Sequence, residues 1–215
     1  MSRVAVTTAL FDPVDAAQRA AALAEAGASG VFTFEGPHDV FTPLAVAASV
    51  PDLRLLTNVA IAFPRNPIHL AHAANDLQLL SGGRFRLGLG TQIRPQIEKR
   101  FGAEFDDPVG RMADKVGAIN AIFDAWETGA PLRYEGTYHR HTLMTPTFDP
   151  GPNPFGRPPV FVGALGPLMT RATATYADGL LVMPFNTADF LASTTIPNIR
   201  RGLSRRARSP RAASR

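Results

Sequence analysis

Two side chains that can exchange protons follow the second predicted strand of this 215-residue chain. Glu35 ends the run Gly30–Glu35 (GVFTFE), and His38 lies three residues later, in the loop. Because the pKa of histidine lies near neutrality, His38 could donate or accept a proton beside a reacting carbon, with Glu35 orienting its ring. We therefore predict His38 and Glu35 as catalytic residues. The alternatives are a loop histidine that caps the next helix and a structural ion pair for Glu35.

A second candidate site lies where Ala164, Leu165 and Gly166 connect the predicted strand Val160–Ala164 to the helix that follows. The first N–H groups of a helix have no partner inside the helix, and they point toward a ligand at its positive end. A glycine at this point allows close approach to the backbone. The pattern predicts an anion-binding turn.

The other histidines form two close pairs. His69 and His72 are three residues apart on a predicted helix, which could suit a metal, but no third ligand is evident and outward positions are favoured. His139 and His141 alternate in a predicted hairpin, so only one of them can face a site, and we favour His141. We predict no metal site.

Three further residues have a structural and a functional interpretation. Asp39 is expected to cap a helix. Arg94 follows a predicted strand and could meet an anionic cofactor tail, although most arginines at such an edge are solvated. Trp126, the only tryptophan, is expected to anchor the core or an interface.

Composition excludes several classes of protein. The chain has no cysteine, which excludes disulfides, thiolate catalysis and Cys-ligated clusters. Hydrophobic residues make up 45% of the chain, enough for a core. The sequence contains no apolar run of the ~18 residues that span a bilayer, and the first residues lack the apolar segment of a signal peptide. We expect a cytoplasmic protein without a membrane partner.

The positive charge is concentrated at one end. Residues 200–215 hold seven arginines and no acid, whereas the remainder holds 15 basic and 18 acidic side chains, a net charge of −3. Such a tail could bind nucleic acid or anionic lipid through counterion release. It shows no interleaved aromatics and no apolar helical face, so we predict a disordered tail over 200–215 and no nucleic-acid partner.

Six β-branched runs alternate with Ala- and Leu-rich segments, which predicts parallel βαβ units and an α/β fold. Both an open doubly wound sheet and a (β/α)8 barrel fit this alternation. Gly88 and Gly90 lie inside a strand and do not form a dinucleotide fingerprint; they indicate close approach by a ligand or a neighbouring layer. The predicted strands are 4–8, 30–35, 53–60, 84–90, 160–164 and 179–183. The predicted helices begin at Asp12-Pro13, Thr42-Pro43, Asn66-Pro67, Asp107-Pro108 and Gly166-Pro167, with a last one near Thr187.

The interval between the fourth and fifth strands is much longer than the others. Its part at 127–158 contains a hairpin-like segment, 133–139, and then a proline-rich stretch. We predict an excursion over one end of the sheet, where α/β enzymes place substrate-binding loops.

Three segments resemble the bacterial luciferase-like monooxygenase family. The first runs from Asn66-Pro67 to LSGGRFRLGLG at 80–90, which is similar to the family's R-N-P helix, L-S-G-G-R turn and L-G-x-G strand. The second is PPVFVGALGP at 158–167 with ADGL at 177–180, and the third is YEGTY at 134–138. The segments 35–39 (EGPHD) and 141–146 (HTLMTP) resemble the branch that uses the deazaflavin coenzyme F420.

The resemblance implies a TIM-type barrel that binds a flavin or deazaflavin at the carboxyl ends of its strands. It places a bulge, often with a non-proline cis peptide, at Asn58-Val59, with Ile61 nearby, behind the cofactor ring. It places the cofactor phosphate at the anion-binding turn and makes Thr91 a hydroxyl contact. The implied cofactor-binding residues are Asn58, Val59, Ile61, Thr91, Ala164, Leu165 and Gly166.

Only about six of the eight βα units are recognisable, and barrels of this type use ~250 residues. We therefore expect an incomplete barrel domain over 1–199, followed by the tail. The implied function is two-electron hydride transfer with F420 on a small organic substrate, within a possible homodimer. The alternatives are an FMN-dependent monooxygenase and a non-catalytic barrel fragment.

Overall fold

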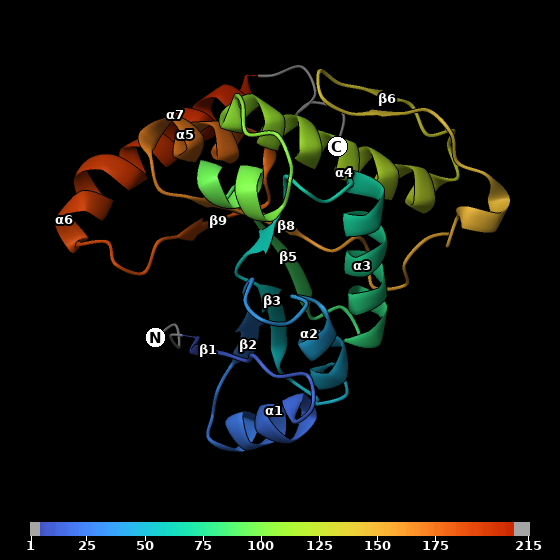
Figure 1. Ribbon diagram of the computed structural model, residues 1–215, viewed down its shortest axis with the longest axis vertical. Coiled ribbons are helices and arrows are strands. Elements are labelled where there is room, and N and C mark those ends of the chain that lie inside the picture. The colour runs from blue at the N-terminus through green and yellow to red at the C-terminus, as the bar shows by residue number, and fades with distance from the viewer. Residues whose placement is uncertain (1–4, 209–215) are drawn as a thin grey trace.

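The protein, described here by a computed structural model over residues 5–208, is built around one parallel sheet (Figure 1). Neighbouring strands follow one another in chain order and every pair in this sheet is parallel. Consecutive order is that of a barrel wall, because a doubly wound sheet reverses direction at a switch point. The strands are β1 (Thr7–Ala9), β2 (Gly30–Thr33), β3 (Arg54–Thr57), β4 (Ala60–Ile61), β5 (Phe85–Gly90), β8 (Val160–Ala164) and β9 (Gly179–Val182).

Proline and a capping residue start several of the helices at the predicted positions. Asn66 accepts the N–H of Ile68 at 3.0 Å, and Asp107 accepts the N–H of Gly110 at 3.1 Å. Pro at the first helical position costs no hydrogen bond. The helices that connect the strands are α1 (Ala16–Glu25), α2 (Thr42–Ala47), α3 (Pro67–Leu80), α4 (Pro108–Thr128) and α5 (Pro167–Tyr176).

The first helix begins later than predicted. The side chain of Asp12 accepts the N–H of Val14 at 2.9 Å, which forms a turn before the helix, and α1 starts at Ala16. The predicted helix start at Asp12-Pro13 was therefore wrong. A local Asx turn competes with the helix for the same backbone, as short polar side chains often do.

The core lies between the sheet and its helices. Leu55, Leu87 and Leu89 in the sheet and Ile119 and Phe123 on α4 are at most 1% exposed. Within the described residues, no helix has both the length and the apolar character to span a membrane.

Gly88 allows β3 and β5 to approach each other closely. A Cβ built on Gly88 would lie 1.8 Å from the carbonyl oxygen of Thr57. The Thr57 hydroxyl also bonds both the N–H and the carbonyl of Gly88, at 2.8 Å each. Gly88 therefore serves the close approach of a neighbouring strand in the same sheet, whereas the two predicted alternatives were a ligand and a neighbouring layer.

The long excursion packs against helices and not over the carboxyl end of the sheet, so its predicted placement was wrong. Its hairpin, β6 (Tyr134–Glu135) and β7 (Arg140–His141), lies on α4. A 3-10 turn, η2 (Pro146–Phe148), follows, and Phe155 then packs beside Gly83, just before β5. The hairpin is held there because Asp114 of α4 accepts its polar groups.

The arginine-rich segment is helical, which contradicts the predicted disorder over residues 200–208. Here α6 (Ala188–Phe190), the π-helical turn η3 (Leu191–Thr195) and α7 (Ile196–Ala207) form one continuous run that packs on α5. Gly202 makes the packing possible, because a Cβ there would lie 2.4 Å from the carbonyl oxygen of Arg171. Burial along one face therefore overrides the charge of the segment, and residues 209–215 lie outside the described part of the chain.

Candidate functional site at the carboxyl ends of the strands

The residues predicted for the site lie along one edge of the sheet. Glu35 and His38 follow β2, and Asn58 and Val59 follow β3. The others lie at the ends of β4, β5 and β8 and at the start of α5: Ile61, Thr91, Ala164, Leu165 and Gly166. Because the carboxyl ends of parallel strands share an edge, residues far apart in sequence meet on the side where barrel enzymes place their active sites.

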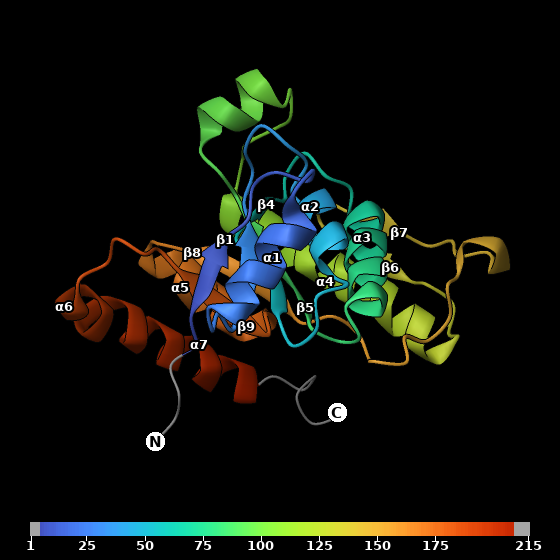
Figure 2. The ribbon, with the colours of Figure 1, turned by 90° about the horizontal axis from the view of Figure 1, so that it is seen from below.

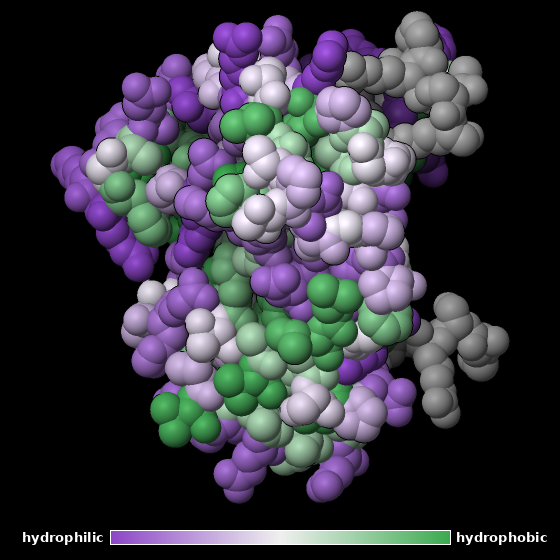
Figure 3. Space-filling view, turned by 90° about the vertical axis from the view of Figure 1, so that its right-hand side faces the viewer, coloured by the Kyte–Doolittle hydropathy of each residue, from purple (hydrophilic) through white to green (hydrophobic). Residues whose placement is uncertain are grey.

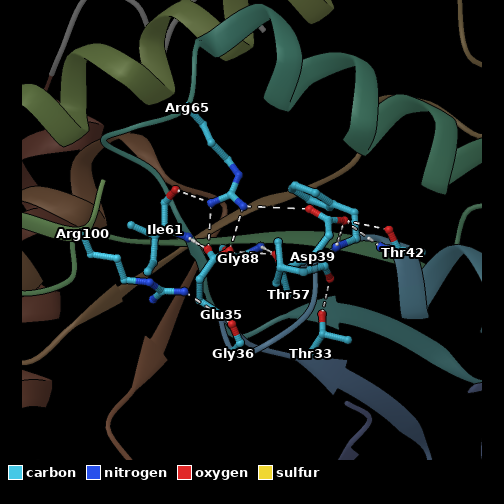
Figure 4. A network of polar contacts seen from close by, with 12 residues as sticks. Thr33, Glu35, Gly36, Asp39, Thr42, Thr57, Ile61, Arg65, Gly88 and Arg100 are labelled. Atoms are coloured by element: carbon cyan, nitrogen blue, oxygen red, sulfur yellow. Dashed lines mark hydrogen bonds and ion pairs between the residues drawn. The ribbon is translucent and has the colours of Figure 1, made fainter. Parts of the chain in front are cut away.

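Glu35 forms a bidentate ion pair with Arg65 (Figure 4). Both Arg65 Nη2 to Glu35 Oε1 and Arg65 Nη1 to Glu35 Oε2 measure 2.7 Å, and Oε2 also accepts the N–H of Ile61 at 2.9 Å. The Glu35 side chain is 9% exposed. Paired, charge-assisted hydrogen bonds are the strong kind. The ion pair that was the alternative for Glu35 is therefore present, and a role in catalysis stays a prediction.

Arg65 links three segments of the chain. Its Nη1 also donates to the carbonyl of Ile61 at 2.9 Å, and its Nη2 lies 4.0 Å from Asp39 Oδ2. Its own carbonyl accepts a hydrogen bond from the Lys115 ammonium on α4. The loop after β4 is thereby fixed to the loop after β2 and to α4. We call Glu35, Ile61 and Arg65 the rim clamp.

Lys115 is buried, with 2% of its surface exposed. Burial, helped by the charge of Arg111, lowers the pKa of Lys115 to about 8. Lys115 lies on the core-facing side of α4 with Met112 and Ile119. Its charge is tolerated there because the ammonium reaches the Arg65 carbonyl.

Val59 lies across the ends of two further strands. The peptide bond between Asn58 and Val59 is cis, at the position that the family resemblance implied. A Cβ built on Gly90 would lie 2.3 Å from Val59 Cγ2, and one built on Gly163 would lie 3.3 Å from Val59 Cγ1. The glycines of β5 and β8 therefore make room for Val59. Its contact with a cofactor stays a prediction.

His38 is exposed and makes no hydrogen bond or ion pair to any residue within 5–208. The structure does not join it to Glu35, whose carboxylate faces Arg65 and Ile61. Its loop is held at Gly36, whose carbonyl accepts a hydrogen bond from Arg100 at 3.4 Å. Arg100 ends the π-helical turn η1 (Gln96–Arg100). Thr91 is half-buried at the end of β5.

The predicted anion-binding turn is open. Leu165 is 57% exposed, and a Cβ built on Gly166 would meet nothing within 4 Å. The Gly166 carbonyl accepts the N–H and the hydroxyl of Thr170 at 3.0 and 2.9 Å, which fixes the first turn of α5. The next N–H groups, of Leu168 and Met169, have no carbonyl one turn earlier in the helix. The geometry fits an anion.

The hairpin histidines differ in their surroundings. Asp114 Oδ2 lies 2.8 Å from His139 Nδ1 and accepts the N–H of Tyr138 at 3.1 Å. Burial raises the pKa of Asp114, but these donors outweigh it and the net pKa is below its ordinary value. Burial lowers the pKa of His139, although the neighbouring Asp114 acts to raise it. Burial also lowers the pKa of His141, and the charge of Lys115 lowers it further. The hairpin that carries His141 lies on α4, and a place for His141 in the site stays a prediction.

Asp39 and Arg94 have structural partners. Asp39 Oδ1 accepts the N–H groups of Phe41 and Thr42 at 2.9 Å each, so its prediction as a cap is confirmed. Arg94 pairs with Glu98 at 2.7 Å and lies over the ring of Phe105.

His69 is exposed, whereas His72 packs against Trp126 with ring centroids 4.7 Å apart. Trp126 is 2% exposed, which confirms it as a core anchor. Among the described residues no group of three or more His, Cys, Asp or Glu could hold a metal.

Sequence reasoning missed Arg65 and Lys115. Arg65 precedes the Asn66-Pro67 helix start, and nothing local indicates that its partner lies 30 residues earlier. Lys115 could have been found, because it falls on the same helical face as Met112 and Ile119, where a charge is unusual.

Fold and site together define a barrel-type α/β scaffold of the kind that carries a ligand at the carboxyl ends of its strands. The family model of luciferase-like monooxygenases matches residues 2–215. The chain belongs to this family.

Named relatives refine the comparison. An uncharacterized protein of Mycobacterium tuberculosis is 45% identical over 194 residues, which are 90% of this chain and 57% of that protein. Another protein of that organism, provisionally named a coenzyme F420-dependent oxidoreductase, is 32% identical over 179 residues, 79% of this chain and 51% of its own. The chain thus spans about half the length of the curated relatives it matches.

Among solved structures, the coenzyme F420-dependent tetrahydromethanopterin reductase of Methanopyrus kandleri is similar, with a TM-score of 0.74 and 22% identity. The match covers 97% of this chain and 63% of that one. At this identity it supports the fold, and the sheet corresponds to part of a luciferase-like barrel.

Proposed function

We propose that the chain provides the cofactor side of an oxidoreductase that transfers hydride between coenzyme F420 and a small organic substrate. The observation that carries the proposal is the 32% identity to a protein named as F420-dependent. The open turn at Gly166 supports it, because F420 is an anionic phosphate ester and the turn presents backbone N–H groups.

Each rim residue has a role in the proposal. Ala164, Leu165 and Gly166 hold the phosphate, and Thr91 offers a hydroxyl to the cofactor. Asn58, Val59 and Ile61 form the wall behind the ring. The cofactor supplies the chemistry of hydride transfer, and the protein supplies orientation.

His38 moves the proton in this proposal. A substrate alcohol that loses a hydride from carbon also loses a proton from oxygen, and an exposed imidazole can take it. Glu35 acts through the rim clamp, which fixes the wall at Ile61.

Titration of the full chain with oxidised F420 tests the proposal. Binding is measured by the change in cofactor fluorescence that depends on the protein. We expect saturable binding that Gly166→Asp weakens at least tenfold, because a carboxylate would repel the phosphate. Thr147→Asp, which adds the same charge on the exposed excursion, serves as the matched control. Equal weakening by the two variants would argue against the turn, and no saturable binding would overturn the proposal for this chain.

The second candidate is an FMN-dependent monooxygenase. The family description, which names monooxygenases, favours it. Tighter saturable binding of FMN than of F420 in the same titration would establish this alternative.

A further inference from the structure

Helix α7 carries the strongest concentration of charge in the described part of the chain. Between Ile196 and Arg208 there are five arginines and no acid. Its neighbour α5 adds Arg171 and also contains no acid. The rest of the molecule is weakly acidic, so the positive charge is confined to one surface.

The packing of α7 determines which arginines face outward. Asn198 and Gly202 are buried against α5, and Arg206 donates to the carbonyl of Ala177 at 2.8 Å. Arg201, Arg205 and Arg208 follow at the i, i+4, i+7 spacing that places side chains on one helical stripe. Figure 2 shows α7 at the edge of the molecule with α5 on its inner side.

The outward arginines are not neutralised. Arg200, Arg201, Arg205 and Arg208 are exposed, and none of them forms an ion pair with a residue in the range 5–208. Asp178, close to the end of α5, is already paired with Arg157 at 3.1 Å. The stripe therefore presents its full charge to solvent.

Aliphatic side chains lie around a further arginine on the exposed face of α7. Ile196, Arg200 and Leu203 follow at the i, i+4, i+7 spacing, and the two aliphatic residues are 42% and 49% exposed. Arginines next to exposed aliphatic residues are typical of a helix that lies in a membrane interface. A surface for single-stranded nucleic acid would instead present aromatic rings for stacking, and the exposed side of α7 has none.

We propose that α7 binds the surface of a bilayer that carries anionic phospholipids. Arg200, Arg201 and Arg208 contact the lipid phosphates, while Ile196 and Leu203, which flank Arg200, enter between the headgroups. Charge complementarity supplies most of the binding, and the aliphatic pair distinguishes lipid from other polyanions.

A membrane-binding α7 reverses the expectation from sequence that the chain has no membrane partner. That expectation rested on a disordered tail without an apolar helical face. The structure replaces the tail, as far as residue 208, with a docked helix that has such a flank. It concerns peripheral binding and not insertion across the bilayer.

Vesicle flotation of the full chain tests the proposal. We expect binding to vesicles of phosphatidylcholine mixed with an equal amount of phosphatidylglycerol, and none to phosphatidylcholine alone. The triple variant Arg200→Gln/Arg201→Gln/Arg208→Gln should bind roughly 100-fold more weakly, since each arginine near an anionic surface contributes about a factor of five. Leu203→Ser should weaken binding several-fold at constant charge.

The matched control is Arg54→Gln/Arg133→Gln/Arg140→Gln, which removes the same charge from exposed arginines elsewhere. If this control loses binding as strongly as the α7 triple variant, the proposal is wrong. Equal binding to both vesicle types would also overturn it. Tighter binding to a duplex oligonucleotide than to anionic vesicles, with Leu203→Ser unchanged, would assign the stripe to nucleic acid instead. Circular dichroism of each variant shows whether the fold is kept.

Discussion

The two halves of the candidate site are built differently. Around β2 and β4, hydrogen bonds and burial fix the side chains, and we call this part the tied half. The Glu35 carboxylate accepts three N–H donors there, and Ile61 is 1% exposed. Around β8 and α5 lies what we call the open half, where Leu165 is 57% exposed and Gly166 has space around it.

The difference matches two tasks of the proposed function. A wall that supports a planar group must not move, and buried charge-assisted bonds fix it. A turn that receives a phosphate must keep its N–H groups available, so it cannot be buried before the ligand arrives. Substitutions in the tied half should therefore affect stability, and those in the open half should affect binding.

The largest effect is expected from Arg65→Met. It leaves the Glu35 carboxylate, which is 9% exposed, without its cation, and breaking a buried pair in this way costs about 3–5 kcal/mol. Urea unfolding at neutral pH measures the loss. Arg94→Met is the matched control, because its pair with Glu98 is exposed on both sides and should contribute less than about 1 kcal/mol. Similar losses for both variants would show that the clamp is no stronger than a surface pair.

Gly88→Ala should also destabilise the tied half, by about 3 kcal/mol, because the added methyl group would overlap the carbonyl of Thr57 and the backbones must separate. Gly36→Ala is the comparison, since the nearest atom to its added carbon lies 3.8 Å away. The unfolding midpoints of the two variants check this. A Gly88→Ala protein as stable as Gly36→Ala would mean that β3 and β5 can move apart at little cost.

The sequence predicted the framework better than the tied half of the site. Pro at N1 after a capping residue located the starts of α3 and α4, because those rules act within a few residues. The bond between Glu35 and Arg65 depends on two loops that only the barrel brings together. The family resemblance located the Asn58-Val59 peptide, at the end of the predicted strand 53–60, and it proposed the open turn, which lies in a continuous motif.

The C-terminal segment shows a different limit. Charge density at residues 200–208 favoured disorder, but Asn198 and Gly202 give the helix a face that fits α5. These two residues lie four apart, at helical spacing, but the surrounding arginines led to the prediction of disorder.

Lys115 should make stability depend on pH. The pKa of its ammonium is about 8 in the folded protein and near 10.5 when unfolded, so the unfolded chain binds more protons between these values. Stability attributable to Lys115 therefore rises with pH, by about 2 kcal/mol between pH 8 and pH 10. The check is the difference in unfolding free energy between the natural chain and Lys115→Met at both pH values, because other titrating groups cancel. A difference that does not change with pH would mean that Lys115 is not held as a buried cation.

The smallest effect on stability is expected in the open half. Leu165→Ser replaces a side chain that is 57% exposed, so the free energy of unfolding should change by less than about 0.5 kcal/mol. F420 binding should nevertheless weaken, because Leu165 is part of the turn at which the phosphate is proposed to bind. Ser204→Ala, on the exposed side of α7, controls for a general effect of surface substitution. A large loss of stability in Leu165→Ser would show that the turn is tied like the opposite half, and the contrast between a fixed wall and an open anion site would then fail.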